Sequence, residues 1–189
     1  MTSPHAFLRS ETRALHERAE SAFARFDLTG AQGYGDFLQA QAAALLPLEA
    51  ALDDAGAARL LPDWPARRRA PDLSADLAAL GRASPPPLPT PAFANDGEAM
   101  GALYVLEGSK LGARHLLARL ADAPPPSGAT RFLAGAERPE RQGQWPAFLA
   151  RLDAAPYGQA DLLTGAARAV AQVERAPVHV AIDSVKARS

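Results

Sequence analysis

Apolar residues recur at helical spacing from the first turns of the chain. Ser3 followed by Pro4 is typical of a helix start, because serine caps free backbone N–H groups and proline fits the first helical position. The residues that then repeat every three or four positions are Leu8, Thr12, Leu15, Ala19, Ala22, Phe23 and Phe26. The pattern predicts a first helix over residues 4–26, followed by a loop.

A second apolar pattern covers residues 34–54 and ends before Gly56, a residue that favours helix termination. Pro47 lies inside this pattern and predicts a kink or a division into two helices, because proline lacks the N–H that an interior helical bond needs. Residues 60–71 are predicted to form a connection with a helical turn at most. The next helix is expected to begin at Pro71 and to continue through Leu80.

The proline-rich residues 81–97 predict an extended connection, after which Asn95 and Glu98 form the capping pattern of a new helix. That helix is expected to continue to about Leu120. Shorter helices are predicted from Ser127 to Phe132 and around residues 145–152, and a last one over residues 157–175, ended by Pro177. The fold class is therefore all-α. We expect a single-domain bundle of about seven or eight helices over residues 1–176, with a flexible tail over residues 177–189.

Composition narrows the class of protein. A chain of 189 residues with 48% hydrophobic residues is typical of one globular domain. The net charge of −1 does not indicate nucleic acid or an anionic membrane as the partner, and Arg67–Arg69 are expected to form a solvated loop. The lack of cysteine excludes disulfides, zinc–thiolate sites and a thiol nucleophile. No apolar segment is long enough to span a membrane or to serve as a signal peptide, so we expect a cytoplasmic protein.

His16 and Glu20 are the first candidates for chemistry, because residues four apart share a face of a helix. The carboxylate would accept a hydrogen bond from one ring nitrogen and leave the other nitrogen as a metal ligand. Arg9 and Arg13 lie on the same side and would meet the carboxylates of a bound anion. On local pattern alone, a histidine among charged residues of an amphipathic helix is more often a solvated surface residue.

Three glycines interrupt the helix predicted after Asn95. Gly101, Gly108 and Gly112 each cost a helix interior about 1 kcal/mol relative to alanine. Gly108 and Gly112 are four apart, so together they form a stripe without side chains, on which a flat ligand or another backbone could lie. The pattern by itself leaves a ligand site and close packing of helices equally open.

Two segments together resemble a known family. Residues 8–20, LRSETRALHERAE, are similar to the proximal helix of heme oxygenases, and residues 103–114, LYVLEGSKLGAR, are similar to the distal helix of the bacterial members. The resemblance is greatest to enzymes associated with bacteriophytochromes and with bacterial iron acquisition. It implies the heme-oxygenase-like all-α fold over most of the chain.

The resemblance also implies roles for individual residues. His16 would be the iron ligand, and Glu20 its hydrogen-bonding partner. Arg9 and Tyr104 match positions that bind heme propionates, and Arg13 is a further basic candidate. Gly108 and Gly112 would bring the distal helix close to the heme, where Ser109 replaces the aspartate of the animal enzymes. With serine at that position, Arg114 is a candidate for organising water.

The activity so implied is oxygen-dependent cleavage of heme to biliverdin, with release of carbon monoxide and iron. Electrons would come from a separate reductase or ferredoxin, since the chain has no flavin or nicotinamide fingerprint. A bacteriophytochrome would be one acceptor of the biliverdin. The alternatives are a non-catalytic heme carrier or sensor with the same fold, a TenA-like or PqqC-like helical protein that binds another small molecule, and a helical bundle that only binds other proteins.

Overall fold

The protein is all-α in the computed structural model, which describes residues 2–89, 92–120, 128–135 and 138–186. These residues form ten α-helices and one short 3₁₀ helix, and no strand, so the predicted fold class is confirmed. The helices are α1 (Pro4–Glu11), α2 (Arg13–Phe23), α3 (Ala31–Asp54), α4 (Ala57–Leu60), α5 (Trp64–Arg67), α6 (Ala70–Ala79), α7 (Asp96–Arg119), α8 (Arg131–Ala134), η3 (Pro139–Arg141), α9 (Gln144–Ala154) and α10 (Gln159–Lys186).

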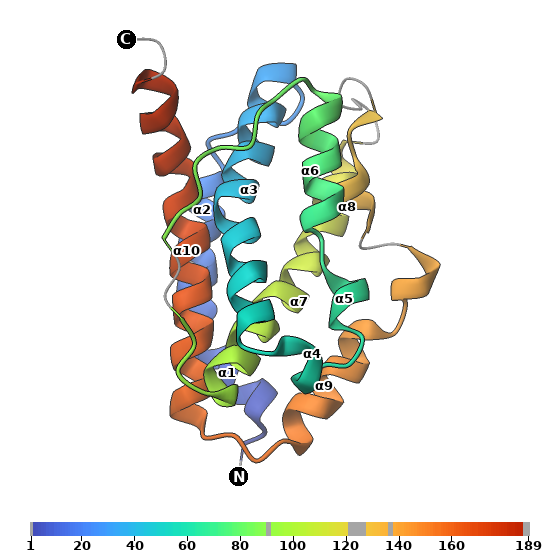
Figure 1. The fold of residues 1–189 in the computed structure, drawn as a ribbon, viewed down its shortest axis with the longest axis vertical. Helices are drawn as coiled ribbons and strands as arrows, with labels where there is room; N and C mark the ends of the chain where they lie inside the picture. The colour runs from blue at the N-terminus through green and yellow to red at the C-terminus, as the bar shows by residue number, and fades with distance from the viewer. Residues whose placement is uncertain (1, 90–91, 121–127, 136–137, 187–189) are drawn as a thin grey trace.

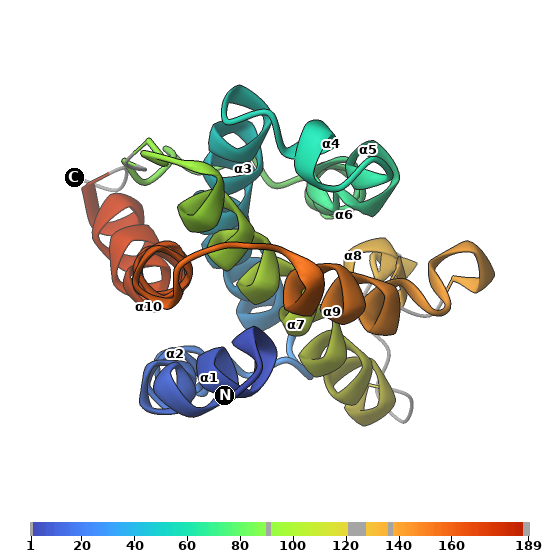
Figure 2. The same cartoon turned by 90° about the horizontal axis from the view of Figure 1, so that it is seen from below.

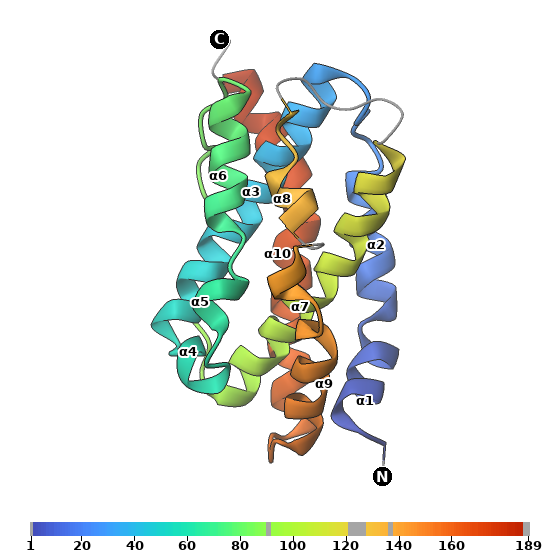
Figure 3. The same ribbon diagram turned by 90° about the vertical axis from the view of Figure 1, so that its right-hand side faces the viewer.

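Helix α7 runs through the middle of the bundle (Figure 2). It packs against α10 along much of its length and against α4, α8 and α9 on its other sides. Helices α3 and α6 form a second layer, seen at the left of Figure 3, while α1 and α2 lie at the opposite side. Helix α10 contacts α1, α2, α3 and α7, and it therefore fixes the first two helices relative to α7 (Figure 1).

The crossing of α7 and α10 brings two backbones into contact. A Cβ atom at Gly101 would lie 2.0 Å from the carbonyl oxygen of Leu162, and one at Gly165 would lie 1.8 Å from that of Glu98. Beside this crossing, the Arg168 guanidinium donates to the Glu98 carboxylate at 2.5 Å. Close helix packing therefore accounts for Gly101, one of the three glycines that made the α7 sequence ambiguous.

Local sequence signals explain most helix ends. The side chain of Asn95 accepts the backbone N–H of Glu98 at 3.0 Å, which confirms the predicted start of α7. Ser3 caps α1 in the same way through the backbone N–H of Ala6. Helix α3 is 24 residues long and contains Pro47, so of the two predicted outcomes, a kink or a division into two helices, the division does not occur. The predicted cap at Ser127 lies outside the described residues; the helix expected there is the short α8.

The predicted end of the last helix at Pro177 is also wrong, because α10 continues to Lys186. An interior proline costs a helix about 3 kcal/mol. Here Ala176 and Val180, on either side of it, are buried against Ala40 and Ala43 of α3 in a small apolar cluster. That packing offsets the cost of the proline. Residues 177–186 of the predicted tail are therefore helical, while the division of the chain at residue 177 stays a prediction.

We expect Gly101→Ala to lower the free energy of unfolding by at least about 1–3 kcal/mol, the usual range for overpacking, because the added methyl group meets a backbone atom that cannot rotate away. Denaturant unfolding, with comparison of midpoints at constant slope, measures the loss. Gly158→Ala is the control, since its Cβ would meet only the side chain of Asp161 at 3.6 Å. Equal stability of the two variants would contradict the described crossing.

Candidate functional site

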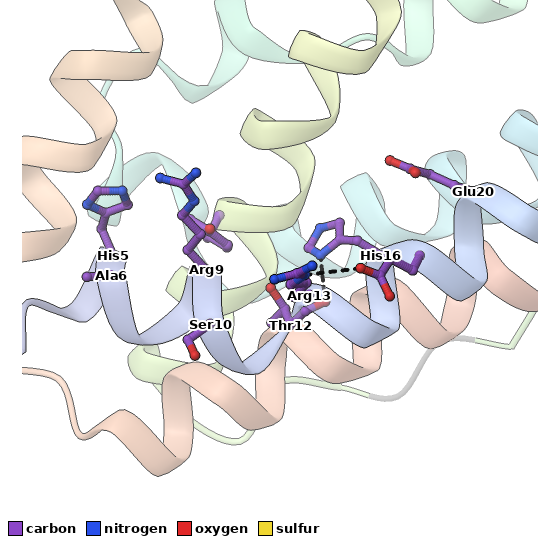
Figure 4. Close-up of a pocket in the computed structure, with 10 residues that line it drawn as sticks. His5, Ala6, Arg9, Ser10, Thr12, Arg13, His16 and Glu20 are labelled. Atoms are coloured by element: carbon purple, nitrogen blue, oxygen red, sulfur yellow. Dashed lines mark hydrogen bonds and ion pairs between the residues drawn. The ribbon is translucent and has the colours of Figure 1, made fainter.

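An open groove of about 650 Å³ lies along α1 and α2. Side chains of these two helices line it, as Figure 4 shows. Tyr104 of α7 also lines the groove. A volume of this size is typical of sites for small molecules. The residues that line the groove are His5, Ala6, Arg9, Ser10, Thr12, Arg13, His16, Glu17, Glu20 and Tyr104.

Four polar side chains form a row along this groove. His5, Arg9, His16 and Glu20 follow one another at four, seven and four residues, a spacing that keeps them on one side of the two helices. Figure 4 shows their side chains on the same side. The structure thus brings together the predicted residues Arg9, His16 and Glu20. His5 was missed as a site residue, although its spacing of four from Arg9 is the signal that could have found it.

The ring of His16 is held by a backbone group rather than by the predicted carboxylate. Its Nδ1 lies 2.8 Å from the carbonyl oxygen of Thr12, so Nδ1 carries the proton and donates it. Glu20 lines the groove one turn further on, and no hydrogen bond joins it to His16 in the described part of the chain. Among the described residues the Thr12 carbonyl therefore takes the place of the predicted hydrogen bond from His16 to Glu20, and the role of Glu20 toward a bound ligand stays a prediction. The Nε2 atom keeps a lone pair for a ligand.

A cation and a phenol face each other across the groove. Burial raises the pKa of the Tyr104 hydroxyl, and the positive charge of Arg9 lowers it in part. Tyr104 therefore stays protonated at neutral pH and is able to donate a hydrogen bond. Its ring packs on Trp145 of α9, with the centroids 5.7 Å apart, which fixes its direction. Arg9 and Tyr104 together suit a carboxylate.

Arg13 has a different environment. Its Nε donates to the Glu17 carboxylate at 3.1 Å, and the side chains of this pair are 81% and 63% exposed. Arg13 lines the groove at its solvent edge, where an ion pair contributes little to stability. Binding of an anion by Arg13 would first have to compete with Glu17.

Gly108 and Gly112 are not explained by packing of the protein on itself. Among the described residues, and apart from the backbone of α7 itself, a Cβ at Gly112 would have no atom within 4 Å, and one at Gly108 would meet only the Trp145 ring, at 3.5 Å. Both glycines follow Tyr104 at intervals of four residues, so they continue the face of α7 that Tyr104 presents to the groove. The three glycines therefore have different roles: Gly101 is buried at a helix crossing, whereas Gly108 and Gly112 leave space beside α7.

Ser109 and Arg114 lie outside the lining of the groove. The Ser109 hydroxyl donates to the carbonyl of Leu106 at 2.8 Å and accepts from the Arg69 guanidinium at 2.6 Å. Only one lone pair of the hydroxyl remains for any other partner. The predicted role of Ser109 in organising water at the site would depend on that lone pair. Arg114 is exposed near the C-terminal end of α7.

The expectation that Arg67–Arg69 form a solvated loop is wrong. Arg67 and Arg69 are only 3% and 4% exposed. Arg67 donates to the buried Glu107 carboxylate at 2.7 Å, and Lys110 donates to its other oxygen at 2.5 Å. These charges lie behind the glycine face of α7 and fix the helix from its far side. No local pattern indicates this cluster, because Arg67 is 40 residues from Glu107 along the chain.

The carboxylate of Glu49 holds the start of α6 beside this cluster. It accepts the backbone N–H groups of Arg69 and Ala70 at 2.8 and 3.1 Å, and the Nε of Arg68 at 3.3 Å. An anion at a helix N-terminus is favourable, since the free N–H groups point toward it. Arg69 is thereby held with its guanidinium 4.9 Å from the centre of the Phe132 ring.

Comparison with known proteins supports the fold. No family model matches the sequence, and no curated protein matches it. Among solved structures, the chain is similar to the NO- and CO-bound heme oxygenase from Neisseria meningitidis, with a TM-score of 0.79 and 24% sequence identity. The match covers 95% of this chain and 92% of the other. The chain has the heme oxygenase fold. None of the described helices combines the length and apolarity needed to cross a membrane.

We expect Gly112→Ala to raise the stability of the ligand-free protein by up to about 1 kcal/mol, because alanine is the better helix former and its methyl group meets open space. Thermal or denaturant unfolding measures the gain. Gly108→Ala is the matched control on the same face, with a smaller gain expected because its Cβ contacts Trp145. A loss of stability for Gly112→Ala would mean that another part of the protein packs on this glycine.

The buried Lys110 predicts a rise of stability with pH. Burial lowers the pKa of its ammonium group to about 8, against the opposing attraction of Glu107. Between pH 8 and the ordinary value of 10.5, the unfolded chain binds this proton and the folded chain does not. Raising the pH through this window therefore favours the folded state, by up to about 1.4 kcal/mol per pH unit.

Lys110→Met removes this contribution, so the free energy of unfolding of the wild type should rise relative to the variant as the pH increases from 8 to 10.5. Urea unfolding of both proteins across that range measures the difference. A difference that is constant with pH would show that Lys110 titrates alike in the folded and unfolded chains.

Proposed function

We propose that this protein binds heme in the groove between α2 and α7 and cleaves it with oxygen to biliverdin, carbon monoxide and iron. One observation carries the proposal: the Nε2 lone pair of His16 has no partner among the described residues and lies in a groove that Tyr104 of α7 also lines. Gly108 and Gly112 follow Tyr104 at intervals of four residues, on the same face of α7. A flat ligand with a central metal fits such a pair of surfaces. The fold shared with a heme oxygenase supports the same ligand.

The residues of the groove suit the parts of heme. His16, in its neutral Nδ1–H form, offers Nε2 to the iron. Arg9 and Tyr104 offer a cation and a hydrogen-bond donor to the propionates at the edge, with Arg13 beside them. With heme held by His16, the bare face of α7 at Gly108 and Gly112 would leave space for oxygen. Heme supplies the iron that activates oxygen against its own porphyrin, so it is substrate as well as cofactor.

A neutral histidine ligand suits ring cleavage, since a thiolate would favour breaking the O–O bond instead. Electrons would come from a separate reductase or ferredoxin. The bacteriophytochrome-associated type, with a bacteriophytochrome as acceptor of biliverdin, and the cytoplasmic location stay predictions from the sequence. So do the roles of Glu20, Ser109 and Arg114.

A heme carrier or sensor with this fold is the second candidate. The observation that favours it is the Ser109 hydroxyl, which is held by Arg69 and Leu106. If no other group orders water beside the glycine face, the site would bind heme and leave it intact.

Titration with hemin tests the proposal. We expect a one-to-one complex with the absorption spectrum of histidine-ligated heme in the wild type, and loss of that ligation in His16→Ala. His179→Ala is the matched control, because this histidine of α10 lies outside the groove, with its ring beside the carbonyl of Pro86, and should not alter the spectrum. Absence of hemin binding by the wild type would contradict the proposal and would leave the TenA-like, PqqC-like and protein-binding alternatives.

Addition of a reductase and oxygen to the complex then separates enzyme from carrier. If the proposed activity is present, biliverdin and carbon monoxide form. Absorbance measures the biliverdin, and trapping with a ferrous globin measures the carbon monoxide. Heme that stays intact under these conditions would leave only the carrier.

A further inference from the structure

Thr12 interrupts the helical run between α1 and α2 and is only 1% exposed. Its backbone N–H and its side-chain hydroxyl both donate to the carbonyl oxygen of Leu8, at 2.9 and 2.8 Å. A threonine that bonds back to the carbonyl four residues earlier bends a helix locally. The helical run is interrupted at Thr12, where the hydroxyl adds this second bond and where no proline or glycine is present.

The carbonyl of Thr12 in turn serves two donors of His16. It accepts the backbone N–H of His16 at 2.9 Å, as in a regular helix, and the ring Nδ1 at 2.8 Å. A carbonyl oxygen has two lone pairs, so both bonds form at once. The second bond forms at the residue where the helical run between α1 and α2 is interrupted.

Glu20 is the competing acceptor. It is exposed, lies one turn beyond His16, and forms no hydrogen bond with the ring in the described structure. The two acceptors differ chemically. A carboxylate draws the Nδ1 proton strongly and gives the ring partial imidazolate character, whereas a neutral carbonyl leaves it an ordinary imidazole.

We propose that Thr12 is a positioning residue for His16: its hydroxyl bends the helix at Leu8, and its carbonyl fixes the Nδ1–H tautomer and the direction of Nε2. The consequence for bound heme rests on the function proposed above. The tautomer and the orientation of the ring are properties of the heme-free protein and do not depend on it.

Nitrogen-15 NMR of the histidine rings in the heme-free protein, at a pH where His16 is neutral, tests this directly. We expect His16 to be almost wholly Nδ1–H in the wild type and in Thr12→Ser, which keeps the hydroxyl. Thr12→Val has nearly the same shape without the hydroxyl, and we expect a mixture of both tautomers. A wild-type ring protonated on Nε2 would overturn the proposal, whether or not Thr12→Val folds.

Two further variants separate a local effect from a general one. Thr164→Val removes the same kind of hydrogen bond, from the Thr164 hydroxyl to the carbonyl of Ala160 at 2.8 Å in α10, and should leave His16 unchanged. Glu20→Gln should also leave the tautomer unchanged. A shift of tautomer in Glu20→Gln but not in Thr12→Val would assign the role to Glu20 and overturn the proposal.

The iron–histidine stretching band of the ferrous heme complex, obtained by reducing the hemin complex and measured by resonance Raman spectroscopy, extends the test. Loss of the hydrogen bond makes the ring a weaker donor, so Thr12→Val should shift the band to lower frequency, Thr12→Ser should restore it, and Glu20→Gln should leave it in place. A band that moves only in Glu20→Gln would overturn the proposal. If hemin does not bind but the tautomer follows Thr12, the proposed function fails and the assignment of Thr12 stands.

Discussion

The contact between the backbones of α7 and α10 is the constraint on which the site depends. Gly101 and Gly165 let the two helices approach so closely that a side chain at either position would overlap a carbonyl group. Helix α10 also packs against α1 and α2, and Arg18 of α2 pairs with Glu174 of α10 at 3.1 Å. The width of the groove between α2 and α7 is thus set by a third helix. Helices α2 and α7 therefore keep their separation without packing against each other along their whole length.

The glycines of α7 serve two physical purposes in one helix. At Gly101 the missing side chain admits the backbone of α10, and the helix recovers the cost of the glycine through packing. At Gly112 no described residue occupies the space where a side chain would lie, so the cost of the glycine is not recovered within the described structure. The charged cluster of Arg67, Glu107 and Lys110 holds α7 from behind. A helix fixed in this way can present a bare face without collapsing onto α2.

Sequence reasoning predicted what local signals encode. The apolar periodicity gave the all-α class, and Asn95 with Glu98 gave the start of α7. The row of Arg9, His16 and Glu20 followed from helical spacing alone. The errors have a common cause, which is tertiary packing. Pro177 was expected to end α10, but burial of Ala176 and Val180 against α3 carries the helix past it.

The electrostatics of the site were beyond local patterns for the same reason. Arg67–Arg69 resembled a solvated run, and only the fold brings Glu107 and Glu49 to them from distant helices. The hydrogen-bond partner of His16 was also not predicted from the sequence, although it lies only four residues away. The spacing of His16 and Glu20 suggested a carboxylate, but spacing does not reveal a bend. The hydroxyl of Thr12 donates to the carbonyl of Leu8, and the backbone carbonyl of Thr12 is the acceptor that the His16 ring uses.

The central claim is that a heme lies between His16 and the glycine face of α7. A crystal structure of the hemin complex, with the iron located by its anomalous scattering, tests it most directly. We expect iron bonded to Nε2 of His16, with the backbone of Gly108 and Gly112 over the opposite face of the ring. We expect the propionates to lie beside Arg9 and Tyr104. Iron bonded to another histidine, or a heme held outside this groove, would contradict it.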